Sequence, residues 1–144
     1  LPHSPFNAIV SPRPIGWIST RGPFGDNLAP YSFFNAVAYT PPQVVFAGSE
    51  KDSLCNIRDT GVFAVNLVSR PLWLQMNQTS ARLARGRDEF LHAGVDKAEC
   101  RVIDCPRVAL SPATLECRLQ QVVTLEGGAD FLVIGTVIDA GRAG

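Results

Sequence analysis

Residues 48–53, Gly-Ser-Glu-Lys-Asp-Ser, precede a segment with helical spacing of apolar residues. The first backbone amides of a helix lack partners within it, and the helix dipole places partial positive charge behind them. Ser49, Lys51 and Ser53 would add hydroxyl donors and a positive charge, so the segment is suited to holding a phosphate group. Capping of the helix by Asp52 or Ser53 explains part of the same pattern, and the spacing of a P-loop is absent. Both interpretations remain open on these residues alone.

Residues 25–35 mix polar turn residues with small, aromatic and hydroxyl side chains. Ala29 and Pro30 would let a flat ring approach the backbone, and free amides with the Ser32 hydroxyl could bond to its heteroatoms. The alternative is an ordinary core strand with aromatic filling. The candidate ring-binding residues are Asn27, Leu28, Ala29, Pro30, Tyr31 and Ser32.

A third segment, residues 11–20, places Arg13 between Pro12 and Pro14 before an apolar run. The two prolines fix φ and limit how the arginine moves, although a stiff start to an edge strand would look the same.

The usual catalytic patterns are missing. The sequence has neither a Gly-x-Ser-x-Gly elbow nor a Gly-x-Gly-x-x-Gly turn after a strand, which argues against hydrolase and Rossmann folds. Asp88 and Glu89 are adjacent, so we expect them to point apart and to be solvated, and we expect His92 on the surface. We assign no catalytic acid or base and expect no metal site, because the four cysteines lack Cys-x-x-Cys pairing.

These segments need elements to position them. Runs rich in Val, Ile and Phe, bounded by turn residues, predict strands over residues 15–19, 43–48, 62–68, 115–125 and 131–138. Gly127-Gly128 predicts a tight reversal between the last two. Short helices are predicted from Asp52 or Ser53 to Gly61, and after Ser69. Many strands with few helices indicate a small, mainly β barrel.

Composition narrows the function. At 144 residues the chain is long enough for one domain, and 13 basic residues balance 13 acidic ones without any block of like charge. This pattern is not that of a nucleic-acid binder. No apolar run approaches the ~20 residues needed to cross a bilayer, so we expect a soluble, cytoplasmic protein with a small-molecule partner.

Read in order, four motifs resemble the flavin reductase-like family. They are Pro-Arg-Pro-Ile-Gly-Trp-Ile-Ser-Thr at 12–20, Asn-Leu-Ala-Pro-Tyr-Ser-Phe-Phe-Asn at 27–35, Lys-Asp-Ser-Leu-Cys-Asn-Ile at 51–57 and Gly-Val-Phe-Ala-Val-Asn at 61–66. The likeness continues through residues 88–94, 106–112, 115–117 and 133–135, and so covers nearly the whole chain.

The resemblance implies a split β-barrel related to FMN binders of the pyridoxamine-phosphate-oxidase type, usually a homodimer with a flavin near each subunit interface. It implies that residues 27–32 line the isoalloxazine ring, and that Ser49, Lys51 and Ser53, with Asp52 between them, hold the phosphate. FMN rather than FAD is the expected cofactor, with NADH or NADPH as co-substrate. We expect one such domain over residues 1–144, incomplete at both ends.

This chain departs from the family at one strand. Relatives often have Glu after the glycine of the late strand and His soon after, whereas here residues 136–140 read Thr-Val-Ile-Asp-Ala. The first hypothesis is an NAD(P)H-dependent flavin reductase passing hydride equivalents through flavin N5, with a monooxygenase as partner. The second is an FMN-holding electron-transfer protein reduced by a partner such as a ferredoxin. A third is a structural domain with an empty barrel.

Overall fold

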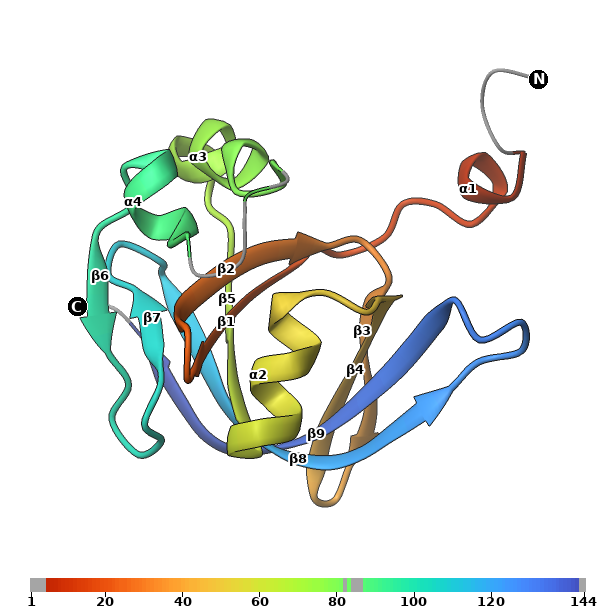
Figure 1. The fold of residues 1–144 in the computed structure, drawn as a ribbon. Helices are drawn as coiled ribbons and strands as arrows, with labels where there is room; N and C mark the ends of the chain where they lie inside the picture. The colour runs from red at the N-terminus through yellow and green to blue at the C-terminus, as the bar shows by residue number, and fades with distance from the viewer. Residues whose placement is uncertain (1–4, 82, 84–86, 143–144) are drawn as a thin grey trace.

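Seven strands form one antiparallel sheet that curls around a helix (Figure 1). The computed structural model describes residues 5–81, 83 and 87–142. The strand order in the sheet is β2-β1-β5-β8-β9-β4-β3, and β6 and β7 form a separate hairpin. The bounds are β1 Gly16–Gly22, β2 Gly25–Tyr31, β3 Phe34–Tyr39, β4 Pro42–Ser49, β5 Val62–Asn66, β6 Lys97–Glu99, β7 Pro106–Val108, β8 Ala113–Thr124 and β9 Asp130–Arg142.

Short helices accompany the sheet. They are α1 Pro5–Ile9, α2 Asp52–Thr60, α3 Trp73–Gln78 and α4 Glu89–Ala93, with a 3-10 turn at Arg70–Leu72 before α3. In Figure 1, α2 lies in the concave side of the sheet, α3 and α4 lie next to each other over β2, and α1 projects away from the body. No described helix is long and apolar enough to cross a membrane.

Strand β1 separates two apolar cores because successive side chains of a strand point to opposite faces. Ile18 belongs to the cluster inside the barrel with Phe63 and Ile57 of α2. Trp17, its neighbour, belongs to the cluster on the other face with Leu28 and Phe90 of α4. Strand β1 is therefore buried on both faces, and α3 and α4 cover the side that the barrel interior does not.

Helix α2 forms and ends as its sequence predicts. Leu54 and Ile57, three positions apart, are both buried against the barrel interior. Gly61 adopts the left-handed conformation at φ 74°, and its amide donates to the carbonyl of Ile57. That conformation favours glycine, so Gly61 stops the helix and turns the chain into β5.

The barrel is split between β2 and β4. Among the described residues, no backbone ladder joins these strands, and side chains close the gap instead. The ring of Tyr31 lies 4.7 Å from that of Phe46, centroid to centroid. A β-carbon on Gly48 would lie 2.7 Å from the Tyr31 ring, so the missing side chain lets β4 approach β2 closely. We call this side-chain contact of Tyr31, Phe46 and Gly48 the seam.

The five predicted strands and two predicted helical segments all occur, mostly with longer strands than predicted. Strands β3, β6 and β7 were not predicted, and β2 occurs where the alternative interpretation of residues 25–35 placed a strand, although at an edge of the sheet rather than in its core. Pro30 cannot donate to a ladder and weakens the strand pattern, but β2 is an edge strand, where proline is tolerated. Arg13, expected to be held rigidly by its flanking prolines, donates to the carbonyls of Asn7 and Val10.

Candidate functional site

A cavity of about 350 Å³ lies beside the split, where β2, the start of α2 and the segment after α3 meet. Its size falls within the range of small-molecule sites in proteins, about 300–1,000 Å³. Seven of the ten predicted binding residues line it: Asn27, Ala29, Pro30, Ser49, Lys51, Asp52 and Ser53. We call it the large cavity. Two segments that the sequence separates are thus brought to one site.

The other three predicted residues do not line the large cavity. Leu28 is fully buried in the core beneath α3 and α4, and Tyr31 is buried inside the barrel at the seam. Ser32 is exposed at the turn into β3. Their roles in ring binding remain predictions, and Leu28 presents only its backbone toward the site.

The start of α2 has no side-chain cap. Lys51, in extended conformation, occupies the N-cap position and makes no capping hydrogen bond. The Ser53 hydroxyl donates instead to Oδ1 of Asn27 at 2.9 Å, and its side chain is buried. The alternative interpretation, in which Asp52 or Ser53 caps the helix, is therefore wrong. Amides of the first turn are left without a side-chain partner of their own helix.

Glu89 is buried at the large cavity, with only 6% of the residue exposed. The prediction that Glu89 is solvated is wrong, because α4 turns it toward β2. Its carboxylate accepts from Nδ2 of Asn27 at 3.1 Å and from the backbone amide of Leu28 at 3.3 Å. Asp88 caps α4 by accepting from the Phe90 amide at 2.8 Å. His92 is exposed, as predicted.

A chain of hydrogen bonds joins three walls of the cavity. Ser53 of α2 donates to Asn27 of β2, and Asn27 donates to Glu89 of α4. Burial raises the pKa of Glu89 to about 7, with a further contribution from the negative charges of Asp52 and Asp88. Glu89 can therefore gain or lose a proton near neutral pH, where an ordinary glutamate stays ionised.

The remaining charges at the cavity are partly compensated. Glu50, exposed at its rim, is paired with Arg58 at 2.7 Å. Lys51 is also exposed, beside the first turn of α2. A phosphate placed there would meet Lys51 and the first amides of α2, with three carboxylates lining the same cavity: Glu50, which is paired with Arg58, Glu89, whose pKa is raised, and Asp52.

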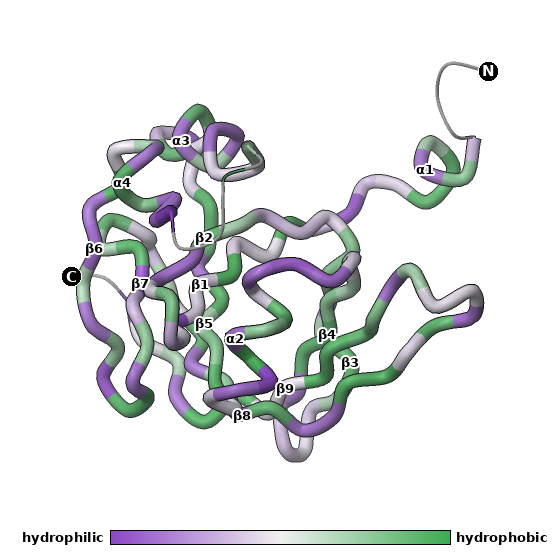
Figure 2. Tube along the Cα trace, viewed as in Figure 1, coloured by the Kyte–Doolittle hydropathy of each residue, from purple (hydrophilic) through white to green (hydrophobic). Residues whose placement is uncertain are grey.

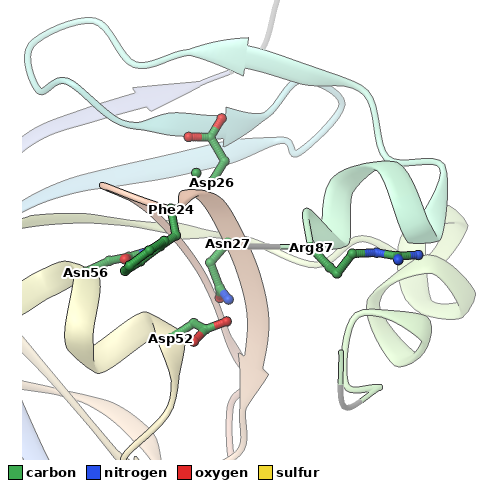
Figure 3. A pocket seen from close by; sticks show the side chains of 7 residues that line it. Phe24, Asp26, Asn27, Asp52, Asn56 and Arg87 are labelled. Carbon is green, nitrogen blue, oxygen red and sulfur yellow. The ribbon is translucent and has the colours of Figure 1, made fainter. Parts of the chain in front are cut away.

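A smaller pocket adjoins the large cavity (Figure 3). Asn27 and Asp52 line both, and their side chains point toward each other in Figure 3, while Arg87 points away from them. Its volume of about 10 Å³ is that of a single water rather than of a ligand. The ligand-sized space at this site is therefore the large cavity alone.

Sequence reasoning missed six residues that line the large cavity: Glu50, Thr79, Ser80, Ala81, Leu83 and Glu89. Thr79, buried after α3, accepts from the indole nitrogen of Trp17 at 2.9 Å and donates to the Met76 carbonyl at 2.6 Å. Nothing in its sequence surroundings predicts this position. For Glu89 a signal exists, since an Asp followed by Glu and then an apolar residue is typical of a helix start.

Comparison with known proteins places these features in context. The profile described as "Flavin reductase like domain" matches residues 10–143. An uncharacterized protein of Deinococcus radiodurans is 42% identical over 142 residues, which cover 91% of this chain and 62% of that protein. The chain thus spans less than two thirds of the length of this relative.

Two solved structures share the fold. Nitrilotriacetate monooxygenase component B from Bacillus cereus superimposes with a TM-score of 0.91 and 27% identity, covering 98% of this chain and 78% of that one. A Shewanella frigidimarina protein assigned as a flavin reductase with a split barrel domain superimposes with a TM-score of 0.85 and 24% identity. The match covers 91% of this chain and 67% of that one. The sheet described above is that split β-barrel, as the sequence resemblance implied.

Proposed function

Because the chain belongs to the flavin reductase-like family, we propose that it is an FMN-binding oxidoreductase, an NAD(P)H-dependent flavin reductase. The observation that carries the proposal is the large cavity, which gathers the segments before α2 and along β2 around a space of about 350 Å³. FMN is proposed rather than FAD on the habit of the family, because both flavins carry a phosphate that the start of α2 could hold.

The residues present suit the cofactor. Uncapped amides at the start of α2, with Lys51 beside them, would hold the phosphate. Asn27, Ala29 and Pro30 on edge strand β2 would line the ring, since small side chains let a flat ring lie against the backbone. The Ser53 hydroxyl is already donated to Asn27, so Ser53 would contribute its backbone amide.

When bound, the flavin supplies the electron chemistry, accepting hydride equivalents from a reduced nicotinamide at N5 and passing them on. The protein's part is to bind, orient and exclude water. The Ser53–Asn27–Glu89 chain fixes the amide of Asn27 at the cavity wall. Glu89 can hold or release a proton there near neutral pH.

Anaerobic mixing of the FMN-loaded protein with NADH and with NADPH tests the proposal. We expect loss of the yellow flavin absorbance with at least one of them, catalytically in the presence of excess free FMN. Protein that binds FMN yet stays yellow with both nucleotides would contradict the reductase activity. Protein that neither retains FMN nor quenches its fluorescence would contradict flavin binding itself.

A second candidate is an FMN-holding electron-transfer protein reduced by a partner protein such as a ferredoxin. The observation in its favour is the late strand β9, where the Glu and His that relatives often carry are replaced by residues 136–140, Thr-Val-Ile-Asp-Ala. Thr136, in the position after the glycine, is buried against the core and supplies neither charge nor imidazole. This candidate predicts bleaching by the reduced partner and not by either nucleotide.

We extend the proposal to assembly and partners. Strand β3 exposes Val37 and Tyr39, with 56% and 92% of the residue accessible, and α1 buries none of its residues. An unpaired, apolar edge strand is a surface that a second copy can cover, which supports a homodimer. The likeness to a monooxygenase component B supports a monooxygenase as the acceptor of reduced flavin. Reliance on nicotinamide nucleotides would place this activity in the cytoplasm.

A further inference from the structure

A second cavity, of about 240 Å³, lies between the β6–β7 hairpin and the paired ends of β8 and β9. It shares no lining residue with the large cavity. Three arginines from separate segments line it: Arg101 in the loop after β6, Arg107 in β7 and Arg142 at the end of β9. We call it the arginine cavity. The chain as a whole has no net charge, so this is a local concentration of positive charge.

The floor of the arginine cavity is rigid. Glu116, of which 2% is exposed, accepts from three consecutive backbone amides, those of Arg101, Val102 and Ile103, at 2.8, 2.7 and 3.1 Å. This carboxylate therefore binds the loop to β8 and is satisfied by amides rather than by an arginine side chain. Ser111 and Thr114 donate their hydroxyl protons to protein acceptors. Recognition of a ligand here falls to the guanidinium groups.

The guanidinium groups are only partly used by the protein. Arg107 donates from Nε to the carbonyl of Glu99 at 3.1 Å. This bond orients the guanidinium group and leaves its two terminal nitrogens available to a ligand. Arg101 is 3.7 Å from Asp139, beyond a good hydrogen bond. Within residues 5–81, 83 and 87–142, the guanidinium group of Arg142 makes no hydrogen bond or ion pair, and only the backbone of the residue is engaged, in the ladder with β8. A planar guanidinium edge without a partner matches a carboxylate or phosphate.

Gly141 keeps the cavity open on the β9 side. A β-carbon there would lie 3.8 Å from a terminal nitrogen of Arg101 and 4.0 Å from Asp139. The arginine side chain thus lies over bare backbone. Counting Asp139 together with Glu116, three positive groups face two negative ones; Glu116 is satisfied by backbone amides, whereas the buried Oδ2 of Asp139 has no hydrogen-bond partner among the described residues.

We propose that the arginine cavity binds a small organic anion with carboxylate or phosphate groups, held by Arg107 and Arg142 with Arg101 at its edge. The site does not depend on flavin binding, because none of its residues belongs to the large cavity. Its volume suits a short dicarboxylate or a phosphate monoester of a three-carbon unit.

The test follows the amide resonances of Ala109 and Gly141 during titration of flavin-free protein with succinate, with glycerol 3-phosphate and with uncharged glycerol. We expect shifts with one or both anions, none with glycerol, and weaker binding at high salt. A response to succinate alone identifies a carboxylate site, and a response to glycerol 3-phosphate alone identifies a phosphate site. No shift at about 50 mM of either anion, well above a millimolar dissociation constant, overturns the proposal.

Variants locate the binding. Arg107→Gln and Arg142→Gln should each weaken binding about tenfold, because each removes a charge-assisted fork. The matched control is Arg118→Gln on β8, exposed and outside this cavity, which should leave affinity unchanged. Unchanged affinity in the folded Arg142→Gln variant, or an equal loss in Arg118→Gln, shows that the cavity is not the site. Arg142 lies at a strand end, so its variant serves even if Arg107→Gln fails to fold.

Discussion

At the scale of single residues, charge at the large cavity decides how a phosphorylated ligand is held. Among the described residues that line it, Lys51 alone is positively charged, and Glu50, Asp52 and Glu89 are acidic. The two groups that respond most directly to substitution are Lys51, which is exposed, and Glu89, which is buried. They act on different quantities, the first on affinity and the second on stability.

Lys51→Ala should weaken FMN binding about tenfold, the loss of roughly one charge-assisted contact. Riboflavin carries the same ring without the phosphate and serves as the matched control ligand. We expect its affinity to be unchanged. Fluorescence quenching titrations measure both. A variant that loses both ligands equally, or neither, would show that Lys51 does not face the phosphate.

Glu89→Gln should change how stability depends on pH. The pKa of Glu89 is about 7 in the folded protein against 4.5 ordinarily, so the folded state keeps a proton that the unfolded state releases between these values. The wild-type free energy of unfolding therefore falls as pH rises from about 4.5 to about 7, by up to about 3 kcal/mol from this group. Glutamine, which does not ionise, removes this slope.

Urea denaturation at pH 4.5, 6 and 8 measures the effect. The variant should differ from wild type least at pH 4.5 and be relatively most stable at pH 8. Glu126→Gln, on the exposed β8–β9 turn, is the control and should follow the wild-type profile. A constant offset between Glu89→Gln and wild type at all three pH values would contradict the raised pKa.

At the scale of elements, the sequence predicts those strands and helix ends that are determined by residues close together in the chain. The apolar runs of β4, β5, β8 and β9 and the Gly61 stop of α2 are visible in the chain and occur where expected. Edge strand β3 was not predicted, because its stability comes from its neighbour in the sheet rather than from its own propensity, and β2 entered only as an alternative interpretation of residues 25–35. The burial of Glu89 could not be predicted for a related reason. It depends on the packing of α4 against β2, which lies about sixty residues earlier in the chain. Seven of the ten predicted binding residues line one cavity, and their part in binding stays a prediction.

The seam between β2 and β4 makes its own prediction. Gly48→Ala should lower the free energy of unfolding by about 1–3 kcal/mol, because the added methyl group would lie 2.7 Å from a Tyr31 ring already packed on Phe46. Gly141→Ala in β9 is the matched control, since its β-carbon would meet nothing nearer than 3.8 Å. Thermal or urea unfolding compares the two. Equal stabilities of the two variants would show that β4 and β2 can move apart to accept the methyl group at no cost, and would contradict tight packing at the seam.

At the scale of the whole molecule, edge strand β3 exposes apolar side chains, among them Val37 and Tyr39. Figure 2 shows hydrophobic colouring on β3, which continues that of β4 and β9, and the α1 arm carries Phe6 and Ile9, both exposed. A chain with no net charge has little electrostatic repulsion to keep copies apart. Association through β3 is the expected result.

Val37→Asp on β3 should convert the proposed homodimer to a monomer, because a carboxylate placed in a buried interface costs several kcal/mol. Light scattering after size-exclusion chromatography measures the mass. Val102→Asp, on the exposed loop between β6 and β7, is the control and should keep the wild-type mass. If the wild type itself elutes at the mass of one chain, the dimer proposal fails.

No backbone ladder joins β2 to β4 among the described residues, and beside the seam one main-chain hydrogen bond, from the Ala47 amide to the Phe33 carbonyl at 2.9 Å, ties β4 to the turn after β2, so parting there breaks few main-chain contacts. Local opening next to the large cavity is then far less costly than global unfolding. A ligand held at this place can enter and leave while the rest of the barrel stays intact, and its residence time is governed by its own affinity. If the proposed flavin binds in the large cavity, this local opening would let it exchange with free flavin without unfolding of the barrel.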